Sequence, residues 1–431
     1  MKRLVLLLAA VLLAGCTLSA PASSVPACSG TASDPVQPSE TLIYFGLPVE
    51  GYNIACQVSE NGYFDFFADY EKNIGFLTRY DFADMTQHIL CDKDGCLHAD
   101  KTCDAYAPCW QVIALSDAVY TVDYNYAEDG ETFTGTQTLV HRDADGMHPR
   151  PVSVIGDWAF FGADEKYLYG FCDGSFGRVD RTTGTETLLL HDAQQLYRYC
   201  GTFLGVWNEQ FVIAVLDPDS AQTLRLDLLS TEGIQTTIAR LDLGSDWPEQ
   251  FACTNVARLE DTVWYLTDDG SLMGFDLSES RTLEGSKALC AYRQDDLIPT
   301  WSLHSFGGKL LAEAHIQRDG AEYPSPYLAV IAPPDGEPVE VTLKEEFRDH
   351  AEEPPPEEGP VFEPSLIRPL GEINGQLVVR CALQFFQRSF TDTTGELCFF
   401  EDHSPVYALM DPEDYFASRP VYREFSSIPN N

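Results

Sequence analysis

A recurring hairpin unit constrains the fold of this chain more than any other feature of its sequence. Each unit has a short run of aromatic and β-branched residues, a tight turn and a second such run, as at 263–266, 267–271 and 272–276. Asp-Gly pairs in several of these turns supply the positive φ that short hairpin loops require. Comparable runs begin next to seven positions: Gly62, Asp117, Glu165, Glu209, Asp261, Gly308 and Gly375.

The spacing of these seven positions predicts a β-propeller. They lie about 52 residues apart on average, which leaves room for four short strands and long loops in each unit. A two-sheet sandwich would not need the same unit seven times. We therefore predict an all-β propeller of six to eight blades, with seven favoured, over residues 41–425. Ring closure is expected to place residues 41–45 beside the last sheet, near 398–400 or 406–409.

The N-terminus predicts an export signal and a tether. Lys2 and Arg3 precede ten apolar residues, too few to span a bilayer as a helix. The Leu-Ala-Gly-Cys that follows resembles a bacterial lipobox, which implies cleavage before Cys16 and a diacylglyceryl group on its thiol. The alternative is an ordinary secretory signal with a chance cysteine. Residues 1–15 are thus predicted to be a lipoprotein signal peptide. Residues 16–40, rich in Ser, Ala, Pro and Thr, are predicted to be a flexible tether.

Acyl chains on Cys16, two or more in number, would anchor the protein stably. The expected location is therefore the extracytoplasmic face of the bacterial cell membrane. The net charge of −40, which becomes about −42 without the signal peptide, argues against nucleic acid and anionic lipid heads as partners. Contact with the membrane is expected through the lipid on Cys16 only. Because hydrophobic residues make up 44% of the chain, the acidity does not indicate disorder.

Residues 91–109 concentrate groups that could bind a metal or form crosslinks. They include Cys91, Cys96, His98, Cys103 and Cys109, between strand-like runs at 86–90 and 110–114. The cluster is therefore expected on the loop that leaves the first blade for the second.

Three interpretations of this cluster stay open. Disulfides suit an exported chain, in which twelve cysteines remain once Cys16 is lipidated. A structural zinc site would use Cys91, Cys96, His98 and Cys103, because three thiolates and an imidazole suit tetrahedral zinc. Free thiols in a reducing niche are the third interpretation. A closed shell of four ligands would make a zinc site structural rather than catalytic.

The signal, the lipobox, the propeller repeats and the motif Cys-x4-Cys-x-His-x4-Cys-x-Ala-Tyr together resemble uncharacterised surface lipoproteins of anaerobic Gram-positive gut bacteria. The ending Asp414-Tyr415-Phe416 is the other specific part of this resemblance. It implies a propeller displayed on the cell surface. It implies no catalytic residue, because no activity is established for these proteins.

Other motifs in the sequence are weaker. The segments 92–95 and 143–146 share the first half of a calcium loop but lack its third acidic position and distal glutamate, so they predict turns. The histidines beside the second segment, His141 and His148, are interpreted as ordinary loop residues. The sequence contains no nucleophile elbow, phosphate loop or zincin motif.

The leading functional hypothesis is a non-enzymatic propeller that binds an unknown surface ligand or protein on one face of the ring. The rival is a carbohydrate-active hydrolase or lyase that uses carboxylates facing the central channel. A purely structural envelope protein is a third hypothesis. None of the three identifies a catalytic residue, and structural zinc is the one cofactor that the sequence suggests.

Overall fold

A computed structural model of the protein describes residues 42–45, 57–69, 74–127, 132–191, 201–217, 219–244, 255–268, 270–285, 302–316, 325–349, 364–391 and 397–428. The chain divides into two units, Met1–Glu40 and Thr41–Asn431, and every described residue belongs to the second unit. The predicted signal peptide, Cys16 and the tether lie outside the described residues and stay predictions. Among the described helices, none has the length and apolar character needed to cross a membrane.

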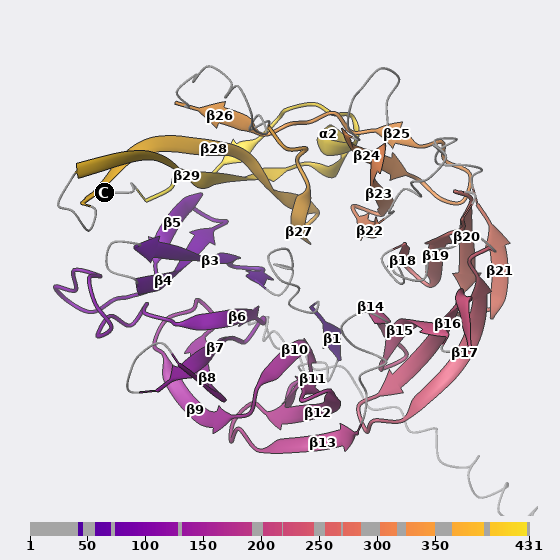
Figure 1. Cartoon of the computed structure of the whole chain (residues 1–431), viewed down its shortest axis with the longest axis horizontal. Helices are drawn as coiled ribbons and strands as arrows, with labels where there is room; N and C mark the ends of the chain where they lie inside the picture. Colours follow the sequence, from indigo (N-terminus) through magenta and orange to yellow (C-terminus); the bar gives the residue numbers. More distant parts are fainter. Residues whose placement is uncertain are drawn as a thin grey trace, which may run out of the picture. The chain divides into compact units, whose positions relative to one another are not determined.

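The second unit is a seven-bladed β-propeller, in which seven sheets follow one another around a ring (Figure 1). Blade 1 contains β2 (Val58–Ser59), β3 (Gly62–Asp69), β4 (Ile74–Asp81) and β5 (Thr86–Ile89). Blade 2 contains β6 (Cys109–Ala114), β7 (Ala118–Tyr126), β8 (Phe133–Asp143) and β9 (Arg150–Ile155). Blade 3 contains β10 (Trp158–Ala163), β11 (Tyr167–Cys172), β12 (Ser175–Asp180) and β13 (Glu186–Leu190).

The remaining blades continue in chain order. Blade 4 contains β14 (Gly201–Trp207), β15 (Gln210–Asp217), β16 (Ser220–Ser230) and β17 (Gln235–Asp242). Blade 5 contains β18 (Val256–Leu259), β19 (Thr262–Leu266), β20 (Leu272–Asp276) and β21 (Arg281–Glu284). Blade 6 contains β22 (Ser302–Phe306), β23 (Lys309–Ile316), β24 (Ser325–Ile331) and β25 (Val339–Glu340). Blade 7 contains β27 (Pro369–Ile373), β28 (Gln376–Thr391), β29 (Leu397–Met410) and β30 (Arg423–Glu424), with β26 (Glu346–Arg348) running parallel to β28 and the short helix α2 (Pro412–Phe416) after β29.

The prediction of seven blades is confirmed. The turns explain why the sequence pattern marked each blade. Each of the seven sequence positions lies at or just before the second strand of a blade: β3, β7, β11, β15, β19, β23 and β28. Several of the turns that precede these strands have positive φ at both central residues, as at Asn208-Glu209, Gly307-Gly308 and Asn374-Gly375. Such turns match the twist of the flanking strands, so the sequence signal marks the hairpin between the first and second strands.

The hydrophobic core lies mainly between neighbouring blades. β10, for example, is buried at all six of its residues, because its blade is covered on both faces. One cluster joins blades 3 and 4 through aromatic rings that include Phe161, Tyr169 and Phe211. A propeller with this packing depends on contacts between each blade and the next, and on the contact of blade 7 with blade 1.

The expected pairing of residues 41–45 with the last sheet is wrong. The strand β1 (Ile43–Tyr44) pairs antiparallel with β10 of blade 3, with Tyr44 opposite Gly162. The Phe45 N–H donates to the Phe161 carbonyl at 2.9 Å. A Cβ at Gly162 would lie 2.9 Å from the Ile43 carbonyl oxygen, so glycine permits the approach. Since β10 is the innermost strand of its blade, β1 lies among the inner strands of the ring (Figure 1).

Ring closure instead uses the segment that follows β30. The Ser426 N–H donates to the Met85 carbonyl at 2.8 Å, and the Gln87 N–H donates to the Ser426 carbonyl at 2.9 Å. The ring of Phe425 packs against Tyr80, with centroids 5.4 Å apart. The C-terminal segment thus joins the outer strand of blade 1, immediately before the cysteine cluster.

Candidate metal centre and adjacent groove

The cysteine cluster lies in an excursion from the outer strand of blade 1. β5 pairs with the second half of β4, up to Thr78 opposite Ile89. The chain then leaves the sheet and returns at residues 105–107, which bond to the first half of β4. The Leu77 N–H donates to the Ala105 carbonyl at 2.7 Å, and the Ala107 N–H donates to the Gly75 carbonyl at 3.3 Å. Residues 91–104, here called the cysteine loop, therefore have both ends fixed on one strand.

Four side chains of the cysteine loop converge. Four potential ligand atoms lie within 4.8 Å of one another, one each from Cys91, Cys96, His98 and Cys103. Among them, His98 Nδ1 lies 3.3 Å from Cys103 Sγ. Zinc binds sulfur at about 2.3 Å and imidazole nitrogen at about 2.0 Å, which places tetrahedral ligand atoms roughly 3.5–3.8 Å apart. The cluster could therefore hold a zinc ion. Cys109, the first residue of β6, is not one of these four.

Local turns present the ligands. The Cys96 N–H donates to the Lys93 carbonyl at 3.1 Å, with Gly95 at φ 73°. His98 also has a positive φ, 49°, a conformation that is uncommon for residues other than glycine. The Lys93 ammonium donates to the Thr102 carbonyl at 2.6 Å, so the two halves of the loop are connected across its base.

The thiols of the cluster differ in their electrostatic surroundings. Burial raises the pKa of Cys103 to about 12. Partial burial also acts to raise the pKa of Cys91. Hydrogen bonds from the backbone N–H groups of Lys93 and Asp104, together with those from the neighbouring cysteine thiols, outweigh it, and the pKa of Cys91 is lowered. Backbone donors thus favour a thiolate at Cys91, the form in which cysteine binds metals.

Arg142 of β8 connects the cysteine loop to blade 2. Its side chain is almost completely buried, with 1% of its surface exposed. One terminal nitrogen donates to the carbonyls of Asp104 at 2.9 Å and Gly146 at 3.3 Å, and the other donates to the Tyr106 carbonyl at 3.5 Å. No local pattern in the sequence indicated this role, because an isolated arginine in a strand is normally solvated.

His148, which the sequence suggested was an ordinary loop residue, is a second link. It lies in the turn between β8 and β9. Its Nε2 lies 3.1 Å from the Asp92 carboxylate, and its Nδ1 lies 2.8 Å from the Asp143 carboxylate. Hydrogen bonds with these two carboxylates raise the pKa of His148. The imidazole therefore joins the cysteine loop to the end of β8.

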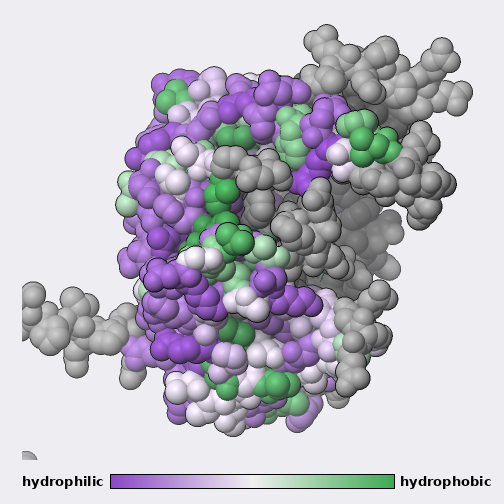
Figure 2. Space-filling model, turned by 90° about the vertical axis from the view of Figure 1, so that its left-hand side faces the viewer, coloured by the Kyte–Doolittle hydropathy of each residue, from purple (hydrophilic) through white to green (hydrophobic). Residues whose placement is uncertain are grey.

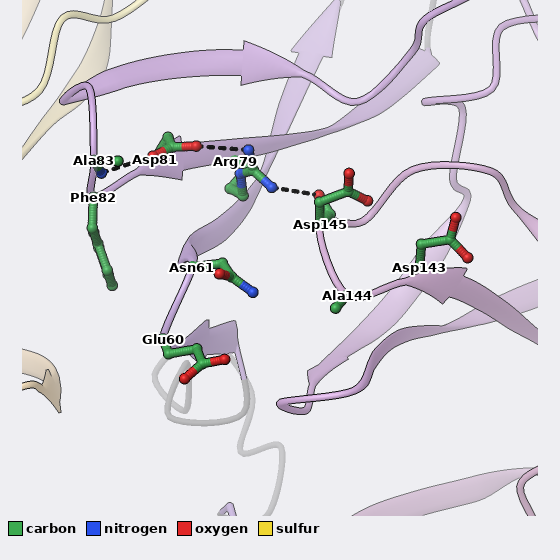
Figure 3. Close-up of a pocket in the computed structure, with 9 residues that line it drawn as sticks. All are labelled: Glu60, Asn61, Arg79, Asp81, Phe82, Ala83, Asp143, Ala144 and Asp145. Atoms are coloured by element: carbon green, nitrogen blue, oxygen red, sulfur yellow. Dashed lines mark hydrogen bonds and ion pairs between the residues drawn. The ribbon is translucent and has the colours of Figure 1, made fainter. Parts of the chain in front are cut away.

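A pocket of about 540 Å³, here called the groove, opens between blades 1 and 2 (Figure 3). The Arg79 guanidinium crosses it, donating to the Asp145 carbonyl at 2.9 Å and to the Asp81 carboxylate at 2.7 Å. Three turns supply the other walls, so no local pattern in the sequence could have indicated the groove. The lining residues are Glu60, Asn61, Arg79, Asp81, Phe82, Ala83, Asp143, Ala144 and Asp145.

Carboxylates in the groove already have partners. The Asp81 carboxylate accepts from Arg79 and from the Ala83 N–H, and that of Asp145 accepts from the Met147 N–H. A hydrogen bond from His148 lowers the pKa of Asp143. A general acid in glycoside hydrolysis needs the opposite shift, because it must carry a proton at neutral pH.

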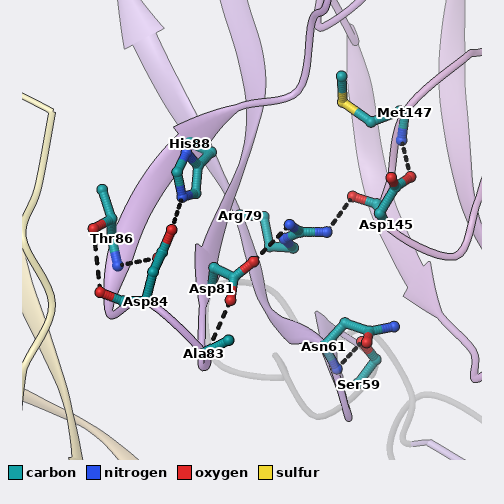
Figure 4. Close-up of polar contacts among 10 residues, drawn as sticks. All are labelled: Ser59, Asn61, Arg79, Asp81, Ala83, Asp84, Thr86, His88, Asp145 and Met147. Atoms are coloured by element: carbon teal, nitrogen blue, oxygen red, sulfur yellow. Dashed lines mark hydrogen bonds and ion pairs between the residues drawn. The ribbon is translucent and has the colours of Figure 1, made fainter.

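A second set of potential metal ligands consists of Asp81, Asp84 and His88 (Figure 4). His88 Nε2 lies 2.8 Å from the Asp84 carboxylate, and both side chains are about half exposed. Arg79 already neutralises Asp81. These three groups are therefore a weaker candidate than the Cys3His cluster, in which Cys103 is buried and the other three side chains are half-buried.

The side of the molecule shown in Figure 2 is mainly hydrophilic, with small separate hydrophobic patches. Leu97, at the tip of the cysteine loop, is the most exposed large hydrophobic side chain of the described residues, at 87%. Scattered apolar side chains of this kind are normal on a soluble surface. The described part of this side thus offers no extended apolar face.

Fold and cluster together define a seven-bladed propeller that carries a Cys3His group in the outer strand of its first blade. No family model matches the sequence, and no curated protein matches it either. Among solved structures, BamB from Moraxella catarrhalis is 13% identical, with a TM-score of 0.32, and the match covers 63% of this chain and 92% of that one. A protein from Lactobacillus plantarum is 12% identical, with a TM-score of 0.35 and coverage of 84% and 96%.

The GH74 xyloglucanase from Xanthomonas campestris is also 12% identical, with a TM-score of 0.40. That match covers 72% of this chain and 47% of the xyloglucanase. At such low identities and TM-scores, these similarities support no conclusion about function, because one fold hosts many unrelated functions. No activity, ligand or partner is transferred from these proteins.

Proposed function

We propose that the Cys3His cluster binds one zinc ion as a structural site and does not form disulfides. The observation that carries this proposal is the convergence of four potential ligand atoms within 4.8 Å. A disulfide would bring two sulfurs to about 2.05 Å and leave the third thiol and the imidazole without a role. A shell of four protein ligands has no open position, so the ion would hold the loop together.

The test is a zinc and free-thiol measurement on protein purified without oxygen. We expect one zinc per chain, and its loss in Cys96→Ser. The control is Cys172→Ser in blade 3, whose thiol lies outside the cluster and whose replacement should leave the zinc content unchanged. Protein with neither metal nor free thiols in the cluster would refute the zinc site and support disulfides.

For the whole protein, we propose a membrane-anchored extracytoplasmic propeller that binds a ligand or partner protein without catalysing a reaction. Three observations support a binding role. The ring presents loops and turns around its rim (Figure 1), and β1 takes up the inner edge of blade 3. The groove is the best candidate site for a ligand, and two of its carboxylates, those of Asp81 and Asp143, are paired with basic side chains. A hydrolase or lyase would instead need two carboxyl groups about 5–10 Å apart, one with a raised pKa.

Binding and turnover can be tested together on residues 41–431. We expect one class among defined glycans and peptides to bind without being cleaved. Asn61→Ala in the groove should weaken that binding, whereas Thr187→Ala, exposed on β13, should not. Measurable turnover of any of these compounds would contradict the non-enzymatic role.

The anchor is tested in cells by metabolic labelling with a palmitate analogue. We expect labelled protein in the membrane fraction, and loss of the label in Cys16→Ser. Cys28→Ser, in the predicted tether, is the matched control and should keep the label. Equal labelling of the two variants would refute lipidation at Cys16.

A further inference from the structure

The turn between β8 and β9, residues 144–149, has the cysteine loop on one side and the groove on the other. Asp143, Ala144 and Asp145 form one wall of the groove. On the other side, a Cβ at Gly146 would lie 2.5 Å from Leu90 Cδ1, just before the cysteine loop begins. Met147 packs against the hydrophobic cluster that contains Cys91, Cys96 and Cys103. The same short turn therefore touches both sites.

Two polar links of this turn reach the cysteine loop, whereas the Asp145 carbonyl is held by Arg79 of β4. Arg142 binds the Gly146 carbonyl of the turn and the Asp104 carbonyl at the end of the loop through one terminal nitrogen. His148 joins Asp92, next to the first cysteine, to Asp143 in the groove wall. A buried guanidinium holds its position only while its acceptors stay in place.

The other contacts that define the cysteine loop are local, such as the hydrogen bond from the Lys93 ammonium to the Thr102 carbonyl. Between its two ends, the loop forms tight turns, and its most exposed member, Leu97, extends into solvent. Without a metal ion, the three thiols and the imidazole provide no strong mutual attraction. A bound metal ion supplies folding free energy directly in small sites of this kind.

From these contacts, we infer that a metal ion at Cys91, Cys96, His98 and Cys103 fixes the β8–β9 turn, so that the groove takes its form only in the metal-loaded protein. The inference rests on the zinc site proposed above. It makes metal occupancy the condition for binding in the groove. Arg142 and His148 are positioning residues, which transmit the state of the loop to the turn.

Hydrogen exchange measured by mass spectrometry tests this coupling on the mature full chain, with and without a zinc chelator. The cysteine loop and the β8–β9 turn both contain hydrogen-bonded amides whose exchange rates report local opening. The Gly146 N–H donates to the Asp143 carbonyl at 2.8 Å, and the Cys103 N–H donates to the Asp100 carbonyl at 3.2 Å. On chelation, we expect exchange to accelerate roughly tenfold or more in both 91–106 and 143–148, as in a local opening. The comparable turn at 231–234 in blade 4 should not change.

The variant His148→Gln tests the link between the cysteine loop and the β8–β9 turn separately from metal binding in the loop. His148 is exposed on about half of its surface, so the protein should fold and keep its zinc. We expect faster exchange at 143–148 in this variant even with zinc bound, and normal protection of 91–104. His141→Gln, on the neighbouring strand β8, is the control and should behave like the wild type.

Two results would overturn the inference while leaving the zinc site intact. In one, chelation exposes 91–104 but leaves 143–148 unchanged. In the other, chelation accelerates hydrogen exchange in all seven blades together, which would mean that the ion stabilises the whole ring and not the β8–β9 turn in particular. A chain that binds no zinc at all would refute the zinc site itself, which the metal measurement reports separately.

Discussion

Arg142 places a charged group where almost no water reaches it. Its exposed fraction is 1%, and its terminal nitrogens donate to three carbonyls from two blades. Charged donors make stronger hydrogen bonds than neutral ones, and the cost of leaving the carbonyls unpaired is high. At the scale of single residues, this guanidinium is a buried polar link between blades 1 and 2.

Replacing Arg142 by methionine should therefore destabilise the protein by about 2–4 kcal/mol, because three buried or part-buried carbonyls lose their donor. The measurement is the free energy of unfolding from urea denaturation. Arg150→Met is the control, since Arg150 lies on the neighbouring strand with 62% of its side chain exposed, and it should cost less than about 1 kcal/mol. Similar losses in the two variants would contradict the role assigned to Arg142.

Asp65 is the second residue with an unusual environment. Burial raises its pKa to about 6, although the Phe66 N–H and the Tyr407 hydroxyl form hydrogen bonds with it. An aspartate in the unfolded chain has a pKa of about 3.9. The folded protein therefore binds more protons between these two values. This carboxyl favours folding most at low pH, and that contribution is lost as the pH rises through about 6.

Asp65→Asn should remove this pH dependence. Relative to the variant, the wild type should lose about 1–3 kcal/mol of stability between pH 4.5 and 7.5. Urea denaturation of both proteins at the two pH values gives the difference directly, because all other titrating groups are shared. Equal changes in the two proteins would show that Asp65 titrates normally.

At the scale of elements, β1 and the cysteine loop are both additions to a regular blade. β1 adds a fifth strand to blade 3, and the cysteine loop interrupts the outer strand of blade 1. The pairing of β1 depends on a residue that allows a close approach. For β1, that residue is Gly162, where a Cβ would lie 2.5 Å from a ring carbon of Phe211 and 2.9 Å from the Ile43 carbonyl.

Gly162→Ala should displace β1 and destabilise the protein by about 1–3 kcal/mol, the usual cost of overpacking. Limited proteolysis should then cleave near residues 42–45 at lower protease concentrations. Gly75→Ala in β4 is the matched control, because its nearest contact would be an ordinary 3.9 Å. If the two alanine variants resist protease equally well, β1 does not depend on Gly162.

At the scale of the whole molecule, closure of the ring joins blades 7 and 1. The aromatic rings of Tyr63, Tyr80, Tyr407 and Phe425 meet at this junction. Tyr63 and Tyr407 are in edge contact, with ring centroids 4.9 Å apart. The backbone of residue 426 then pairs with the outer strand of blade 1. Closure thus combines an aromatic cluster with a short backbone link, and it removes an exposed sheet edge.

Phe425→Ala should weaken closure by about 3–5 kcal/mol, because it empties a buried aromatic site. Hydrogen exchange should accelerate at Gln87, whose N–H bonds to the Ser426 carbonyl. Val421→Ala is the control, with 58% of Val421 exposed, and should change neither measurement. Normal protection of Gln87 in the Phe425 variant would show that closure lies elsewhere.

Much of the fold and part of the site could be predicted from local patterns. The recurring runs of aromatic and β-branched residues after tight turns identified the second strand of every blade, because a hairpin is encoded within a few residues. The short spacing of Cys91, Cys96, His98 and Cys103 predicted that they could meet, since neighbours in one loop need no distant partner to come together. The signal peptide, the tether and lipidation at Cys16 stay predictions made from the sequence.

Only the tertiary structure decided which distant segments meet. Residues 41–45 have the apolar pattern of a strand, but that pattern would fit any open sheet edge. They pair with blade 3 because Gly162, which has no side chain, lets the backbone of β1 come close. Arg142 and His148 gained their roles because the blades bring the end of β8 against the cysteine loop. The sequence by itself thus determined the repeated blade and its cysteine excursion, which are local. The pairing of β1, the closure of the ring and the groove depend on shape and burial between segments that are far apart in the chain.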